Sequence, residues 1–345
     1  MKTYIILTLL LFSSAVVFPQ QTKRDSILRN VEEYKGRVLK DAAVFINTSN
    51  TTEQRIKAIQ KHAIIYDDQQ KAMFKRIVLS ENEKPEIRAL ALNKIYAEAD
   101  KDNEFLNQIM RWFSNPQTPK ALRDETLSLI GNLSFSSMPG ILEPYHKMVE
   151  DPDVAFREFA FSKLVLNGDA RAQQLLIRGL EGQNTKPLDN LTAIRILSSA
   201  PKKDFYPAVY KILLETQNED ERLLAIQTLG GYPAAKEKLA SIFMSREEKS
   251  KFRENALISF YNYNKRETVT YLTEILGDPS ASADLKIIAI QLAINERKAI
   301  SYRKKAKKAD KLDTLIRDIS NGRNDADKEL TAIAKKYLLL VRPVF

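Results

Sequence analysis

A pattern that recurs along most of the chain constrains its fold more than any other feature of the sequence. Successive copies start 31 to 35 residues apart, at Arg55, Arg88, Arg123, Arg157, Asn190, Arg222, Arg253 and Lys286. Three residues later the chain has a small residue, at Ala58, Ala91, Thr126, Ala160, Ala193, Ala225, Ala256 and Ala289. The next residue is large and apolar, at Ile59, Leu92, Leu127, Phe161, Ile194, Ile226, Leu257 and Ile290. A repeat of this length predicts a solenoid, in which each unit packs on its neighbours.

The spacing of apolar residues predicts two antiparallel helices in each repeat. The first helix carries the recurring pattern, and the second has its own apolar stripe, as at Phe105, Ile109 and Trp112. A small residue lets helices of adjacent units approach to about 8–10 Å. The basic residue of the pattern is expected to pair with an acidic residue or a helix C-terminus of the adjoining unit. The candidate acidic partners stand two residues before it, at Glu53, Glu86, Asp220 and Asp284.

The segment Asp151–Leu164 reads Asp-Pro-x-x-x-Phe-Arg-x-x-Ala-Phe-x-x-Leu, and it resembles the first helix of HEAT repeats. The resemblance covers about residues 51–295. It implies an all-α fold, a right-handed α-solenoid of about eight HEAT-like helix pairs. Residues 21–50 would then be an N-terminal capping helix, and residues 296–345 a basic segment with C-terminal capping helices. HEAT arrays serve as scaffolds, as adaptors and in a few cases as enzymes, so the resemblance implies a fold rather than a function.

Residues 1–20 differ in composition from the rest of the chain and have the pattern of a secretory signal peptide. Lys2 is followed by an apolar run from Tyr4 to Val17, which is shorter than the roughly 20 residues of a membrane-spanning helix. Cleavage after the small residues Ser13 and Ala15, or nearer Gln20, is expected, and an uncleaved membrane anchor is the alternative. No second run of spanning length follows. The expected location is the periplasm or the medium, and the absence of cysteine excludes a lipoprotein anchor and disulfides.

The sequence contains few residues suited to catalysis. Cysteine is absent, and the two histidines, His62 and His146, are far apart. No metalloprotease, hydrolase or phosphate-binding motif occurs. The chain is therefore predicted to be no enzyme and to need no cofactor or metal. A HEAT-like DNA glycosylase is the enzymatic alternative, but the single tryptophan, Trp112, falls in a core stripe.

Two groups of residues stand outside the repeat and are candidate binding residues. The first is a set of tyrosines on or near the second helices, which are expected to line the inner curve: Tyr206, Tyr210, Tyr261, Tyr263 and Tyr271. Exposed tyrosines there would bind a peptide or a glycan, and filling of core gaps is the alternative. The second is a basic run that would bind polyanions with a steep dependence on salt: Arg303, Lys304, Lys305, Lys307, Lys308 and Lys311. A solvated helix face or linker is the alternative for this run.

The leading hypothesis from the sequence is an exported, non-enzymatic scaffold or adaptor that binds a protein or peptide on its concave face. The net charge of +10 supports a second hypothesis, a module that binds anionic glycan or lipid through the basic run. Nucleic acid is a disfavoured partner for an exported protein. The glycosylase is the third hypothesis.

Overall fold

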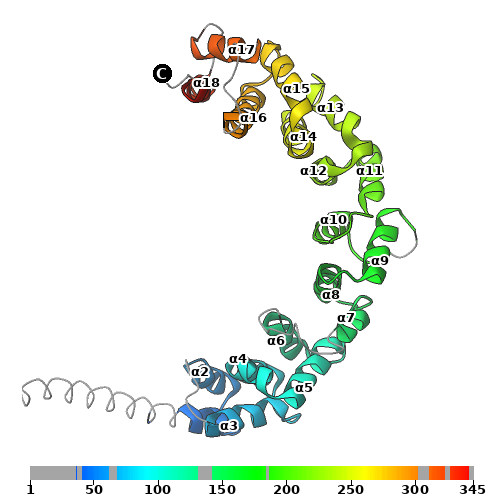
Figure 1. Cartoon of the computed structure of the whole chain (residues 1–345). Helices are drawn as coiled ribbons and strands as arrows, with labels where there is room; N and C mark the ends of the chain where they lie inside the picture. The colour runs from blue at the N-terminus through cyan, green and yellow to red at the C-terminus, as the bar shows by residue number, and fades with distance from the viewer. Residues whose placement is uncertain are drawn as a thin grey trace, which may run out of the picture. The chain divides into compact units, whose positions relative to one another are not determined.

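The computed structural model describes residues 36, 41–61, 68–130, 142–183, 186–301, 311–322 and 327–341. This part of the chain consists of helices and connecting turns without a strand, so the predicted all-α fold is confirmed (Figure 1). The predicted signal peptide and most of the predicted N-terminal helix lie outside the described residues. The chain divides into two compact units, Met1–Lys147 and Met148–Phe345.

The N-terminal unit is built from short helices packed in two layers. Its elements are α2 (Thr52–Lys61), α3 (Asp68–Leu79), α4 (Pro85–Ile95), the 3-10 helix η1 (Tyr96–Lys101), α5 (Asn103–Ser114), α6 (Lys120–Ile130) and, at the boundary, α7 (Glu143–Met148). Helix α4 packs on both α2 and α6, while α3 contacts α4 and α5 contacts α6. A short helix on each flank thus covers the apolar face of the central one.

The C-terminal unit repeats this arrangement over more helices. Its elements are α8 (Val154–Leu166), α9 (Ala170–Leu180), α10 (Asn190–Ser198), α11 (Tyr206–Glu215), α12 (Glu219–Thr228), η2 (Leu229–Gly231), η3 (Pro233–Ala235), α13 (Lys236–Met244), α14 (Ser250–Tyr263), α15 (Lys265–Gly277), α16 (Ala283–Ser301), α17 (Lys311–Ser320) and α18 (Lys328–Val341). Helices α8, α10, α12, α14 and α16 pack one on the next. The helices between them form a second layer.

Within the C-terminal unit the row α8, α10, α12 and α14 lies on the inner side of the curve, and α9, α11, α13 and α15 lie on the outer side (Figure 1). The expectation that second helices line the inner curve is therefore wrong for this unit. The physical reason lies in the recurring small residue. It stands on the first helices, so those helices approach one another closely, and the row bends toward the more closely spaced layer.

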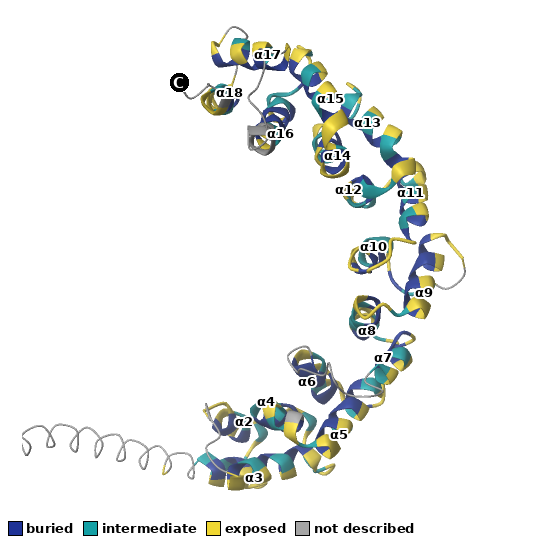
Figure 2. Cartoon of the chain, in the orientation of Figure 1, coloured by how far each residue is buried: buried dark blue, intermediate teal, exposed yellow. Residues whose placement is uncertain are grey.

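The recurring pattern forms the core between the layers. All eight small positions are buried, with at most 4% of the residue exposed. The large apolar residue that follows is fully buried in seven of the eight copies, and Leu127, beside Thr126, is half-buried. Figure 2 shows that the helix faces turned toward the other layer are buried and the opposite faces exposed.

Four of the recurring arginines make the same hydrogen bond. Each donates its Nε–H to the carbonyl ten residues earlier, at the end of the preceding helix: Arg55 to Phe45 (2.7 Å), Arg88 to Val78 (2.9 Å), Arg123 to Phe113 (3.1 Å) and Arg253 to Phe243 (3.0 Å). The last carbonyls of a helix have no partner within it, and they carry its negative partial charge. The predicted pairing with a helix C-terminus is confirmed for these arginines.

The acidic partners are not the ones expected from the sequence. Arg55 forms an ion pair with Glu83 and Arg222 with Glu248, whereas Glu53 pairs with Lys57. The residues two positions before the basic residue, Glu53, Glu86, Asp220 and Asp284, lie on its own helix and are exposed. Arg157 also departs from the common bond, because its Nε donates to the carbonyl of Pro187 at 3.0 Å.

Two helices end the C-terminal unit. Helix α18 packs against both α16 and α17, and the buried hydroxyl of Tyr337 donates to the carboxylate of Asp313 at 2.6 Å. No helix in the described ranges combines the length and the apolar character needed to cross a membrane.

Candidate functional site

Three of the five predicted tyrosines come together in the C-terminal unit with a fourth that the sequence did not single out. Tyr206 begins α11 and Tyr210 follows one turn later, Tyr232 lies between η2 and η3, and Tyr263 ends α14. The ring centroids of Tyr206 and Tyr232 are 5.5 Å apart, and those of Tyr210 and Tyr232 are 5.9 Å apart. We call these four residues the tyrosine surface. They lie where the first helix of a pair turns into the second, in three consecutive pairs.

Two glycines bring Tyr263 into this group. A Cβ atom on Gly231 would lie 2.7 Å from Cε1 of Tyr263, and a Cβ on Gly230 would lie 2.4 Å from the backbone oxygen of Ser259. Only a residue without a side chain lets the turn after α12 approach α14 so closely. A hydrogen bond also joins the two helices, because the hydroxyl of Ser259 on α14 donates to the carbonyl of Ile226 on α12 at 2.7 Å.

The side chains of the tyrosine surface range from half-buried to exposed. Partial burial raises the pKa of Tyr206 above its usual range. The neighbouring Tyr263 raises it further, through its charge and through a hydrogen bond. Tyr263 is 65% exposed, and Tyr206, Tyr210 and Tyr232 are half-buried. The four residues therefore combine aromatic rings in contact with one another with side chains that are partly or largely exposed.

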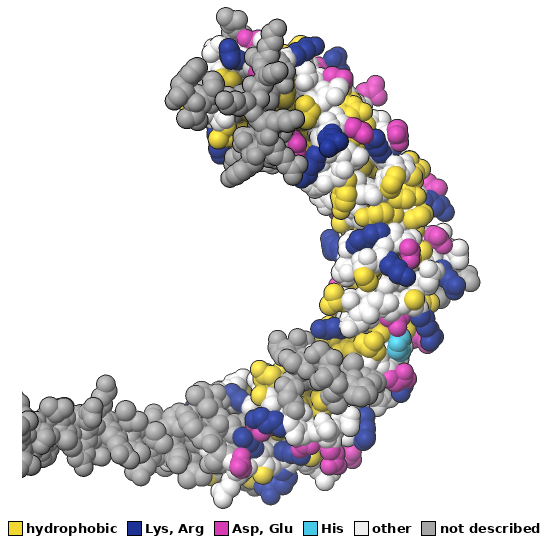
Figure 3. Space-filling model, viewed as in Figure 1, with side chains coloured by type: hydrophobic (Ala, Val, Ile, Leu, Met, Phe, Trp, Pro, Cys, Tyr) yellow, Lys and Arg dark blue, Asp and Glu magenta, His cyan; other side chains and the backbone are white. Residues whose placement is uncertain are grey.

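Further apolar side chains are exposed on the same helices. Leu214 of α11 is 54% exposed and Ile258 of α14 is 40% exposed, while Pro207 and Pro233 adjoin two of the tyrosines and are exposed as well. Figure 3 shows hydrophobic side chains gathered over the region of α11 and α12. Exposed apolar patches of this kind mark binding surfaces more often than single exposed residues do.

The other two predicted tyrosines do not belong to this surface. Tyr261 is 7% exposed and donates to Glu296 at 2.9 Å, and burial together with that carboxylate raises its pKa to about 12. It stands two residues before Tyr263, which is a rotation of about 200° around the helix. Tyr271 packs edge-on against Phe243 and Phe260 at 5.2 and 5.5 Å. For these two residues the filling of core gaps is the better interpretation.

The basic run is mostly outside the described residues. Arg303, Lys304, Lys305, Lys307 and Lys308 fall in the range 302–310, and only Lys311, the exposed first residue of α17, is described.

Tyr232 is the residue that sequence reasoning missed. Its neighbours carry the available signal, since Gly230-Gly231-Tyr232-Pro233 interrupts the repeat with residues typical of a turn. A tyrosine inside such a break has no place in either helix stripe, so its ring is free to face the surface.

The described residues hold no group of three or more His, Cys, Asp and Glu side chains suited to a metal ion. Trp112 is half-buried beneath the guanidinium of Arg88, whose Cζ lies 5.1 Å from the ring centroid, and His62 lies outside the described residues. Comparison with family models, with curated proteins and with solved structures returned no match.

Proposed function

We propose that this chain is an exported, non-enzymatic scaffold of the HEAT-like class, and that it binds an extended peptide segment of a protein partner at the tyrosine surface. Its architecture in this proposal is a right-handed α-solenoid of about eight helix pairs, α2/α3 to α16/α17. The recurring arginine bond and the buried small positions support the repeat. The right hand follows from the resemblance to HEAT repeats and stays a prediction.

The tyrosine surface is the single observation that carries the binding proposal. Tyrosine supplies a large apolar area at little cost in side-chain entropy, and its hydroxyl bonds to the main chain of a partner. Four such rings lie in mutual contact or close to one another, and the contact with Gly230 and Gly231 fixes Tyr263 before any partner arrives. Such pre-organisation lowers the entropy cost of binding.

The location of this surface changes one part of the hypothesis. The sequence placed binding on the concave face, whereas the tyrosines lie along the edge formed by the turns within the helix pairs. An edge built from successive turns presents side chains at the repeat spacing, which suits an extended chain running along it.

A photo-cross-linking amino acid at position 263 tests the proposal in the native envelope. We expect position 263 to cross-link a discrete partner, and the same reagent at the half-buried Tyr96 of the N-terminal unit to give none. The adduct should disappear when Tyr232→Ser is added. Equal cross-linking from both positions, or adducts that persist in the Tyr232→Ser background, would contradict the proposal.

Polyanion binding through Arg303–Lys311 is retained as a prediction, supported by the net charge of +10. Retention of the protein on an anionic column, abolished by moderate salt and by replacing the six basic residues, is its expected signature.

A further inference from the structure

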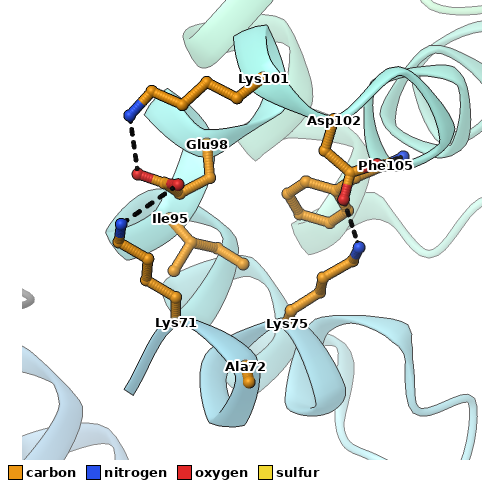
Figure 4. A pocket seen from close by; sticks show the side chains of 8 residues that line it. All are labelled: Lys71, Ala72, Lys75, Ile95, Glu98, Lys101, Asp102 and Phe105. Carbon is orange, nitrogen blue, oxygen red and sulfur yellow. Dashed lines mark hydrogen bonds and ion pairs between the residues drawn. The ribbon is translucent and has the colours of Figure 1, made fainter. Parts of the chain in front are cut away.

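A small cavity lies in the N-terminal unit, between α3, η1 and the start of α5 (Figure 4). Its volume is about 280 Å³, and its lining is contributed by Lys71, Ala72 and Lys75 of α3, Ile95 of α4, Glu98 and Lys101 of η1, and Asp102 and Phe105 at the start of α5. Ile95 and Phe105 are each only 2% exposed and form an apolar floor. The charged residues stand around that floor.

Ion pairs stand on two sides of the cavity. On one side Lys71 and Lys101 share the carboxylate of Glu98, at 3.4 and 3.5 Å (Figure 4). On the other side Lys75 pairs with Asp102, whose other oxygen caps α5 by accepting from the backbone N–H of Phe105 at 3.0 Å. Hydrogen bonding to Lys75 lowers the pKa of Asp102, and hydrogen bonding to Asp68 raises the pKa of Lys71, so Asp102 and Lys71 are charged at neutral pH.

The balance of donors and acceptors decides what this cavity suits. Each of the four carboxylate oxygens of Glu98 and Asp102 already accepts a bond. An ammonium group has three N–H donors, and among the described residues Lys101 uses one of them and Lys71 two. Three lysines also face two carboxylates in the lining, and the additional partner of Lys71, Asp68, is 98% exposed and weakly held. The cavity therefore has donors to offer and few acceptors.

We infer that this cavity binds a small monocarboxylate with a short apolar body. The carboxylate meets Lys101 and Lys71 at the rim, and the apolar body lies over Ile95 and Ala72. Cavities that hold drug-sized ligands span about 300 to 1,000 Å³, so the ligand here is small. A cationic ligand is disfavoured because both acidic residues are already engaged. This site lies in a different unit from the tyrosine surface, so either proposal can fail without the other.

Three probes with the same alkyl chain and different head groups separate the contribution of the carboxylate from that of the apolar chain. Dissociation constants of hexanoate, 1-hexanol and hexylammonium are measured on the purified full chain by ligand-observed NMR, with acetate as the head group alone. We expect hexanoate to bind at least tenfold more tightly than each of the others. Equal affinity for hexanoate and 1-hexanol would overturn the proposal, and so would acetate binding as well as hexanoate, which would indicate an adventitious ion only.

Two variants locate the binding. Lys101→Gln removes a charge from a side chain that is 71% exposed, and it is expected to weaken hexanoate at least fivefold. Lys57→Gln is the matched control, since Lys57 is 67% exposed and pairs with Glu53 on α2. Ala72→Leu fills the cavity and should abolish binding, with circular dichroism confirming that the variant folds. Equal effects of Lys101→Gln and Lys57→Gln on hexanoate affinity would refute the assignment, whatever the result with Ala72→Leu.

Discussion

The bond from a recurring arginine to the preceding helix predicts a large effect of one substitution, Arg253→Met. Arg253 is 6% exposed, and its Nε donates to the carbonyl of Phe243 at 3.0 Å. Methionine keeps most of the aliphatic volume, so little cavity is created. The substitution removes a hydrogen bond from a charged donor and leaves a buried carbonyl at the end of α13 without it. We expect the free energy of unfolding to fall by about 1.5 to 3 kcal/mol.

Urea denaturation followed by circular dichroism measures this loss of stability. Two further variants test whether the loss comes from the Nε–H bond or from the removal of a charge. Arg253→Lys keeps the charge but lacks the Nε–H, so it should lose nearly as much as Arg253→Met. Lys251→Met, on the same helix, removes an exposed ion pair with Glu219 and should cost less. If Arg253→Met and Lys251→Met were equally stable, the bond from Arg253 to Phe243 would not be what holds adjacent repeats together, and the reasoning would be wrong.

Three other predictions concern the C-terminal unit. Gly230→Ala should lower the free energy of unfolding by about 1 to 3 kcal/mol in urea, because its Cβ would lie 2.4 Å from the backbone oxygen of Ser259; a neutral effect would show that α12 and α14 are less tightly packed. Tyr337→Phe should cost about 1.5 to 3 kcal/mol, since the buried Asp313 loses a donor at 2.6 Å, and an unchanged melting curve would contradict this. The pKa of Tyr261 is raised from 10.0 to about 12, so the folded state holds this proton more tightly than the unfolded state. The stabilisation from protonated Tyr261 is complete below pH 10 and is lost as the pH rises through 12. Tyr261→Phe should therefore reduce the fall of the free energy of unfolding across that pH range. The same pH dependence in the wild type and the variant would argue against the raised pKa.

Periodic features of this fold are the ones that the sequence predicts well. The small residue three positions after the recurring basic residue meets the same steric demand at every helix crossing, so Ala58 and Ala289 are both buried as expected. The predicted pairing of the basic residue with a helix C-terminus is confirmed at four of the eight positions, Arg55, Arg88, Arg123 and Arg253, where the guanidinium meets a carbonyl at the end of the preceding helix.

Features that depend on position in space are harder to predict. The apolar stripes predict two rows of helices, and the structure shows that the row with the small residue is the inner one in the C-terminal unit. Tyr261 and Tyr263 are two residues apart and the sequence does not distinguish them, yet Tyr261 is 7% exposed and Tyr263 is 65% exposed. Only the close approach of Gly230 and Gly231 makes Tyr263 part of a surface with Tyr232.

The cavity of the N-terminal unit has no sequence signature for the same reason. Lys71, Glu98 and Asp102 are unremarkable among the 54 basic and 44 acidic residues of the chain. They gather because η1 changes the direction of the chain between α4 and α5, and a 3-10 segment of this kind is not visible in the apolar periodicity.

The dissociation constant of the partner segment recovered by cross-linking at position 263 tests the central claim most directly. It is measured for the wild type, for Tyr232→Ser and for the matched Tyr96→Ser. Because tyrosines at the centre of an interface commonly contribute about 2 kcal/mol or more, we predict that Tyr232→Ser weakens binding at least tenfold while Tyr96→Ser leaves it unchanged. Equal dissociation constants for the wild type and Tyr232→Ser would show that the partner binds elsewhere and that the tyrosine surface is not the binding site.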